Sequence, residues 1–313
     1  MGEVARGGAA VWGHRMAVLT AWATLALIFV GGVVTNTGSG LAVPDWPTTF
    51  GHSMFLYPWS RMVGGVLYEH SHRLIGSLVG LLTMATAAAL WRAAPRRLLR
   101  ALGLVAVGAV IAQGVLGGLR VVLLNTTLAV IHGIMAQTFF AFIAGLAVRT
   151  SREWAEAARG AAPAGGALLR RLCLLTLGLV YLQVVLGAVL THTGALLHAH
   201  LLVAALVAVQ VLWLTARILG THPALPGLAR PARVLAALVM GQLLLGLGSY
   251  VGRFTALGVA MAPGLALAFP VLHRMGGTLL LGAALVLALR AHRVLGMPEA
   301  PPGGRELAGE VAA

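Results

Sequence analysis

Four histidines stand at matching places in the two halves of the chain, each near one end of a long apolar segment. They are His72, His132, His200 and His273. Imidazole is costly to hold among lipid tails unless it has a partner, so an ionisable residue at membrane depth indicates a functional site. A single histidine in an apolar helix is usually a hydrogen-bonded packing residue, but four in register favour function. The pattern predicts two metal or haem sites inside a membrane.

The pairing of these histidines favours haem over zinc. His72 pairs with His132 in the first half, and His200 pairs with His273 in the second. Two imidazoles from facing helices of a bundle suit a bis-histidine haem. Zinc needs a third or fourth donor from Cys, His or a carboxylate, and the second half has no carboxylate near its pair. The sequence has no CxxCH motif, so we expect any haem to be held non-covalently.

Two further histidines, His70 and His198, lie two residues before a candidate ligand. Residues two apart on a helix differ by about 200° in direction, so only one of each couple can face the bundle centre. Matching apolar runs follow His72 and His200, which favours these two as the inward ligands. We therefore predict that His70 and His198 are outward polar groups at the membrane surface, and their use as substitute ligands stays open.

One acid separates the two pairs chemically. Glu69 lies three residues before His72 and shares its helix face, whereas the matching residue in the second half is Leu197. A carboxylate beside one pair suits proton-coupled chemistry, with Glu69 as proton donor, proton acceptor or electrostatic group, and the other pair suits electron transfer. The alternative is a surface acid paired with Arg73.

Two arginines directly follow candidate ligands, Arg73 after His72 and Arg274 after His273. Guanidinium groups so placed can reach the propionates of a bound haem as charge-assisted donors. The alternative is that both side chains snorkel to the membrane interface.

The elements that must position these residues are transmembrane helices. The chain has 313 residues, of which 59% are hydrophobic and 10% charged, and its apolar runs reach the roughly 20 residues that span a bilayer. We predict an all-α membrane protein in contact with lipid. The eight expected spans are approximately 17–35, 69–91, 101–120, 126–148, 170–191, 196–217, 232–251 and 269–291.

The basic residues indicate orientation rather than nucleic-acid binding. All 22 are arginine, which excludes the lysine Schiff base of a retinal protein. Most lie in the short loops after the second, fourth and sixth spans, as the positive-inside rule expects. We therefore place both termini in the cytoplasm and the four histidines towards the outer face of a bacterial or archaeal plasma membrane, with no nucleic-acid partner.

Internal repeats predict two pseudo-symmetric four-helix bundles, over residues 1–150 and 151–313. Residues 35–38 (Thr-Asn-Thr-Gly) resemble 191–194 (Thr-His-Thr-Gly), and a Gln-x-x-x-Gly motif recurs at 113–117, 183–187 and 242–246. Each half has an even number of spans, so the pseudo-axis runs along the membrane normal. The first bundle also has a long outer loop, about 37–68, which we expect to form a lid at the interface rather than a plain connector.

The sequence resembles the haem A synthases over nearly its whole length. The resemblance rests on residues 37–47 (TGSGLAVPDWP), the Glu-His-Ser-His-Arg-Leu run at 69–74 and the later histidines. It implies an eight-helix enzyme that oxidises a methyl group of haem O to the formyl group of haem A for terminal oxidase assembly. The methyl is expected to be hydroxylated twice, and loss of water then gives the aldehyde. The family pattern implies that His72 and His132 hold haem O or haem A, that Glu69 is the functional acid, and that His200 and His273 hold a haem b that passes electrons.

The chain departs from this family at one place. Many members have a cysteine pair in the outer loop, where this sequence has Val43 and Thr49. No thiol relay or disulfide can operate there, and Cys173 cannot substitute because it is expected near the cytoplasmic end of the fifth span. The electron donor and the source of the inserted oxygen are not identified by the sequence, and haem O synthase is a candidate partner.

Two other functions compete with this one. A di-haem cytochrome b would pass electrons from quinol to a partner, but it would not need Glu69 beside only one haem. A transporter could bind cations or shuttle protons through the histidines, but the spans lack the paired Gly/Pro interruptions near the midplane where such sites are built.

Overall fold

The computed structural model describes residues 2–93, 97–157, 165–221 and 226–295. Within these ranges, eight helices are long and apolar enough to cross a membrane. They are α1 (Gly2–Asn36), α2 (Gly64–Ala93), α3 (Arg97–Val122), α4 (Thr126–Thr150), α6 (Gly166–Thr193), α7 (Leu197–Thr221), α8 (Pro226–Phe254) and α9 (Pro263–Val294). A short helix, α5 (Arg152–Glu156), follows α4. The prediction of an all-α membrane protein with eight spans is confirmed.

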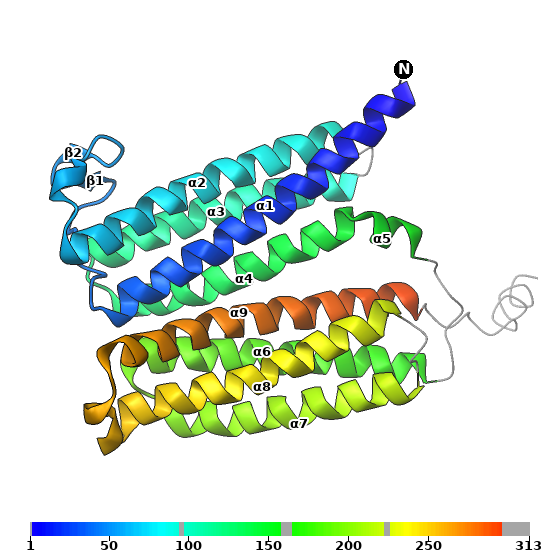
Figure 1. Ribbon diagram of the computed structural model, residues 1–313. Helices are drawn as coiled ribbons and strands as arrows, with labels where there is room; N and C mark the ends of the chain where they lie inside the picture. Colours follow the sequence, from blue (N-terminus) through cyan, green and yellow to red (C-terminus); the bar gives the residue numbers. More distant parts are fainter. Residues whose placement is uncertain (1, 94–96, 158–164, 222–225, 296–313) are drawn as a thin grey trace, which may run out of the picture.

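The long helices pack as two neighbouring groups of four (Figure 1). In the first group α1 contacts α2 and α4, and α3 contacts the same two helices. In the second group α6, α7, α8 and α9 contact one another in the same cyclic order. The contacts of α1 and α4 with α9, and of α4 with α6, form the seam between the groups. This arrangement is consistent with the two predicted bundles, while the boundary at residue 150 stays a prediction.

Short turns bring the four candidate ligands to the same end of the molecule. The side chain of Asn125 accepts a hydrogen bond from the Leu128 N–H and caps the start of α4. α6 ends at Thr193 and is capped by Gly194, whose φ of 72° is readily adopted by glycine, and α7 begins three residues after this cap. His72, His132, His200 and His273 all lie within the first three turns of their helices, at the end opposite the first residues of α1 (Figure 1).

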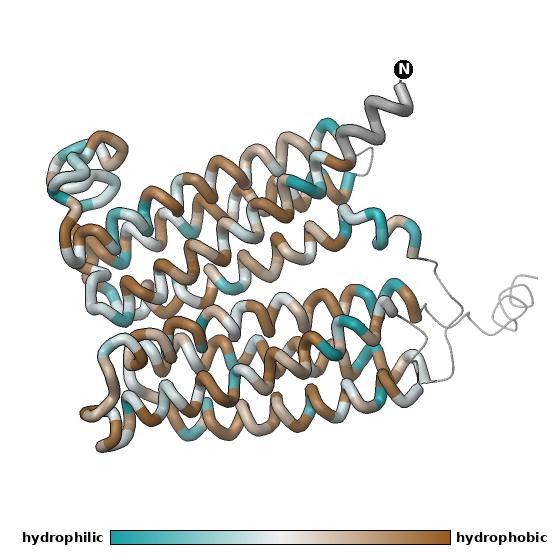
Figure 2. Tube along the Cα trace, viewed as in Figure 1, coloured by the Kyte–Doolittle hydropathy of each residue, from teal (hydrophilic) through white to brown (hydrophobic). Residues whose placement is uncertain are grey.

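The helix surfaces are largely apolar, as expected for a chain surrounded by lipid (Figure 2). The second bundle has the larger continuous core, which includes Leu214, Leu235 and Leu287 at its centre. In the first bundle Val79, Ala106 and Ile143 form a smaller buried cluster. Tight packing below the histidines gives the outer ends of the helices a fixed spacing.

The outer loop is folded against the start of α2. It contains a two-stranded antiparallel hairpin, β1 (Thr48–Thr49) with β2 (His52–Ser53), and a 3₁₀ turn at Trp59–Arg61. The carboxylate of Asp45 organises the loop, because it accepts hydrogen bonds from the Thr48 hydroxyl and from two backbone N–H groups. The second helix begins at Gly64 rather than at residue 69, so the loop ends earlier than predicted.

Candidate functional site

A cavity of about 910 Å³ extends through the half of both bundles that contains the four histidines. Residues from all eight long helices line it, including the four predicted histidines. Its volume lies in the upper part of the range of about 300–1,000 Å³ that is usual for small-molecule and cofactor sites. The fold therefore brings both histidine pairs to one interior space.

Each of the four imidazoles packs against a glycine of the helix that precedes it in the chain. A Cβ atom on that glycine would lie between 2.9 and 3.2 Å from the Cε1 atom of the ring. The four contacts are Gly31 with His72, Gly117 with His132, Gly187 with His200 and Gly246 with His273. Three of these glycines end the repeated Gln-x-x-x-Gly motif, so the repeat supplies the surfaces against which the histidine rings pack. We call the four glycines the seats of the histidines.

The imidazoles retain unused hydrogen-bonding capacity. The Nδ1 atoms of all four rings are buried, and none makes a hydrogen bond of ordinary geometry with the described residues. The backbone of Leu27, Gln113 and Gln242 nevertheless interacts with the rings of His72, His132 and His273, respectively. Buried ring nitrogens are normally well paired, so the poor pairing here is compatible with rings that bind a ligand. The Nε2 of Gln183 lies 3.2 Å from His200 Nε2 and donates to the His200 carbonyl. At the matching place in the first half, Gln113 Nε2 donates to the His132 carbonyl at 2.9 Å.

The geometry of the second pair suits two axial ligands of one metal ion. The ring centroids of His200 and His273 are 6.2 Å apart and their planes are inclined by 78°. Two metal–imidazole bonds of about 2 Å each, extended by half the width of each ring, give roughly this separation. In the described ranges no three His, Cys, Asp or Glu side chains gather as a metal site. A metal ion bound by either pair would therefore need further ligands, such as the four nitrogens of a porphyrin.

Glu69 lies at the edge of this cavity and is 3% exposed. One of its oxygens accepts a hydrogen bond from Arg73 at 2.9 Å, and the other accepts from the Val43 N–H at 2.9 Å. The pairing with Arg73 that the alternative interpretation foresaw is present, but the acid is buried rather than on the surface.

Arg73 connects the outer loop to α2. Its two terminal nitrogens donate to the carbonyl oxygens of Val43, Asp45 and Thr48, at 2.7 to 3.0 Å, as well as to Glu69. The side chain also lines the cavity. Its predicted contact with a haem propionate stays a prediction, and the observed contacts give it a second task in holding the loop.

The prediction for the two neighbouring histidines was right for one and wrong for the other. His198 is exposed. His70 points away from the cavity as expected, but it is only 1% exposed because the outer loop folds back over it. Its Nδ1 lies 3.1 Å from the Thr49 hydroxyl and its ring packs on Tyr57. Sequence reasoning missed this contact because it joins residues across a loop whose path is set by tertiary structure.

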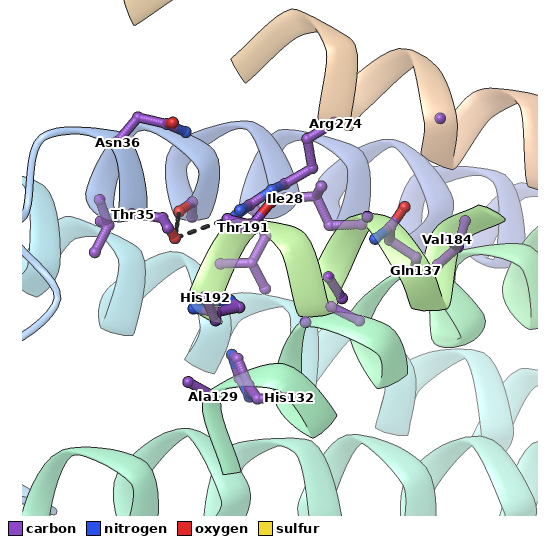
Figure 3. Close-up of a pocket in the computed structure, with 18 of the residues that line it drawn as sticks. Ile28, Thr35, Asn36, Ala129, His132, Gln137, Val184, Thr191, His192 and Arg274 are labelled. Atoms are coloured by element: carbon purple, nitrogen blue, oxygen red, sulfur yellow. Dashed lines mark hydrogen bonds between the residues drawn. The ribbon is translucent and has the colours of Figure 1, made fainter. Parts of the chain in front are cut away.

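Three cavity residues were not singled out from the sequence. Trp46 of the outer loop lines the cavity and packs closely on Gly118. Arg120, at the end of α3, donates to the Gly40 carbonyl at 2.9 Å. His192, near the end of α6, lies on the same side of the cavity as His132 (Figure 3). The repeat gave a signal for His192, because it stands where the first half has Asn36.

These features define a polytopic membrane protein with one interior cavity lined by two pairs of histidines. The family model described as COX15-CtaA, cytochrome oxidase assembly protein, matches residues 14–201, which is more than half of the chain. The chain belongs to this family. The match includes His72, His132 and His200, whereas His273 lies beyond it.

Two bacterial relatives are similar to part of the chain. A heme A synthase of Shouchella clausii (strain KSM-K16) is 30% identical over 187 residues, which cover 58% of this chain and 60% of the relative. A heme A synthase of Alkalihalophilus pseudofirmus (strain ATCC BAA-2126 / JCM 17055 / OF4) is 32% identical over 130 residues, which cover 40% of this chain and 42% of the relative. The chain thus spans less than two thirds of the length of either relative.

Proposed function

We propose that this protein is a haem A synthase, which oxidises a methyl group of haem O to the formyl group of haem A. The observation that supports it most is the shared cavity, where four imidazoles each pack against a glycine and only one pair has an acid beside it. The family match and the names of the two relatives point the same way.

The residues divide into two sites. His72 and His132 would hold the substrate haem, and His200 and His273 would hold a b-type haem that passes electrons to it. The bound haems supply the redox chemistry. The chain supplies four glycine seats for the imidazoles, a mostly apolar cavity lining, and the loop residue Trp46 at the side of the first site.

Glu69 would act as a proton acceptor or as a fixed negative charge. Both of its oxygens accept hydrogen bonds from N–H donors, one of them a guanidinium, and this arrangement suits the carboxylate rather than the protonated acid. Oxidation of a methyl group to an aldehyde releases protons, and a carboxylate at the cavity edge can take one up. The second pair has Leu197 at the matching position, so proton uptake would occur beside the first pair only.

The distribution of arginines also supports an orientation. The loops after α2, α4 and α7 are rich in arginine, so the positive-inside rule would place them in the cytoplasm. The cavity opens near the other end of the helices and would face the outer side of the membrane.

Haem extraction tests the proposal. The full-length protein should be purified from cells that make haem O, and its haems identified by mass. Haem B together with haem O, hydroxylated haem O or haem A is the expected result. Haem B alone at both sites would instead favour a di-haem cytochrome that only transfers electrons.

Substitution of the acid tests the division of roles. Glu69→Ala should keep most of the haem content and stop formyl production. The matched control is Glu153→Ala, because Glu153 is an exposed acid of α5 that pairs with Arg290 far from the cavity. Full formyl production in Glu69→Ala would remove this role.

A further inference from the structure

We propose that Arg274, although it follows the second-site residue His273 in sequence, serves the first site, where it binds a carboxylate of the macrocycle held by His72 and His132. Arg120 and His192 complete this carboxylate-binding group at the seam between the bundles. The inference rests on the proposed function only in that the first site holds a haem with free propionates.

A chain of contacts joins Arg274 to the seat of His72. Arg274 lies on α9 of the second bundle, and its Nη1 donates to the Thr35 hydroxyl of α1 at 3.1 Å (Figure 3). That hydroxyl donates in turn to the Gly31 carbonyl at 2.9 Å. Gly31 is the glycine against which the His72 ring packs. Because consecutive residues of a helix point about 100° apart, Arg274 turns away from the second site while His273 faces it.

His192 crosses the seam in the same direction as Arg274. It belongs to α6 of the second bundle, yet its Nε2 would lie 3.7 Å from a Cβ atom on Gly133, the residue after His132.

The charges near the first pair do not balance. The guanidinium groups of Arg73, Arg120 and Arg274 gather there, with Glu69 as the single carboxylate, and Arg73 pairs with it. Arg120 meets a backbone carbonyl and Arg274 a hydroxyl, and neither has a carboxylate partner in the described part of the chain. Glu69 also attracts Arg120 from a distance, so the three guanidiniums and one carboxylate together leave two net positive charges, which are costly at membrane depth. Haem has two carboxylates, so it is a ligand that would neutralise both positive charges.

The exposed arginine of the cavity rim does not change this balance. Arg253 also lines the cavity, but it is exposed to solvent and donates to the Asn36 side chain at 2.7 Å. Its charge can be screened by water, whereas Arg120 and Arg274 are only partly exposed.

The first test measures which haem depends on Arg274. In the full-length holoprotein, Arg274→Gln should speed release of the first-site haem to a haem-scavenging apoprotein by roughly 10- to 100-fold, since it removes a charged hydrogen bond. Release of the second-site haem should not change. Arg274→Lys should restore part of the retention, and Arg290→Gln, on the same helix but at its far end, is the matched control. Faster release from the second site, from both sites equally, or from neither would overturn the proposal.

The second test measures the ligand chemistry at the first site alone. His200→Ala protein, which keeps only the first pair, should bind haem B more tightly than haem B dimethyl ester, and Arg274→Gln should remove most of this preference. An unchanged preference would overturn the proposal. Because the probe is haem B, this result is independent of haem O oxidation, so failure of the proposed function and failure of this inference can be told apart. If His200→Ala does not accumulate, the protein with both sites can be loaded with haem B or with its dimethyl ester. The faster phase of haem release then gives the same comparison between the two ligands.

Discussion

Gly117 and His132 are so close that a Cβ atom on the glycine would lie 2.9 Å from the Cε1 atom of the ring. The same contact occurs at the other three candidate ligands, always with a glycine of the preceding helix. Each glycine lets the ring come closer than van der Waals contact with a Cβ atom would allow. The close fit between ring and glycine then fixes the direction of the imidazole.

A methyl group added at a seat should therefore displace one imidazole and leave the other site intact. We expect Gly117→Ala to weaken haem binding at the first site by about 1–3 kcal/mol, the usual cost of overpacking, and Gly187→Ala to do the same at the second. Site-resolved haem titration measures both. Gly114→Ala is the control, since a Cβ there meets nothing within 4 Å. If Gly114→Ala weakened haem binding as much as Gly117→Ala, the role of Gly117 as a seat would be contradicted.

Loss of the Arg73 side chain should release the outer loop. Arg73→Gln removes hydrogen bonds to three loop carbonyls, so amide hydrogen exchange of residues 43–53 should accelerate while the helices stay protected. Arg61→Gln, at an exposed position of the same loop, should leave exchange unchanged. Unaltered protection in Arg73→Gln would show that other contacts hold the loop.

Acid should loosen the same loop through Asp45. Burial would raise the pKa of Asp45, but hydrogen bonds from the Gly51 N–H, the Thr48 hydroxyl and the Phe50 N–H outweigh it and lower the pKa from 3.8 to about 2. Because the folded value is depressed, the stabilisation is complete above pH 3.8 and is lost as the pH falls towards 2. Loop hydrogen exchange followed against pH should show this loss in the parent protein.

The variant Asp45→Asn separates this carboxylate from other acid effects. It should have a less protected loop at neutral pH and should converge with the parent protein near pH 2. A constant difference between the two proteins across this range would contradict the assignment.

His70 and His72 should differ sharply in their effect on haem content. His72→Ala should lose the first-site haem, whereas His70→Gln should retain both haems and weaken only the loop, through the contact with Thr49. Extracted haem per protein and loop proteolysis together measure this, and the exposed His198→Gln is the control. Loss of first-site haem in His70→Gln with His72→Ala unaffected would reverse the ligand assignment.

Sequence patterns predicted the helices well because membrane depth imposes a strong constraint. Each expected span falls on one observed helix, and the errors are at the ends. The sixth span, 196–217, begins one residue before α7, and the helices otherwise reach or continue past the ends of the expected spans. The second span shows this, since α2 starts at Gly64 while the apolar pattern starts near residue 69. Backbone groups need partners at the interface as well as in the core, so helices extend beyond the lipid tails.

The sequence by itself determined eight spans, two matched histidine pairs and one acid on the face of His72, because helical periodicity and hydropathy are local properties. Tertiary structure alone decided that His70 lies beneath the loop, that glycines of one helix seat the imidazoles of the next, and that Arg274 of one bundle meets Thr35 of the other. These contacts join residues up to 239 positions apart. Local patterns do not encode such proximity, since it arises only when the two bundles pack against each other.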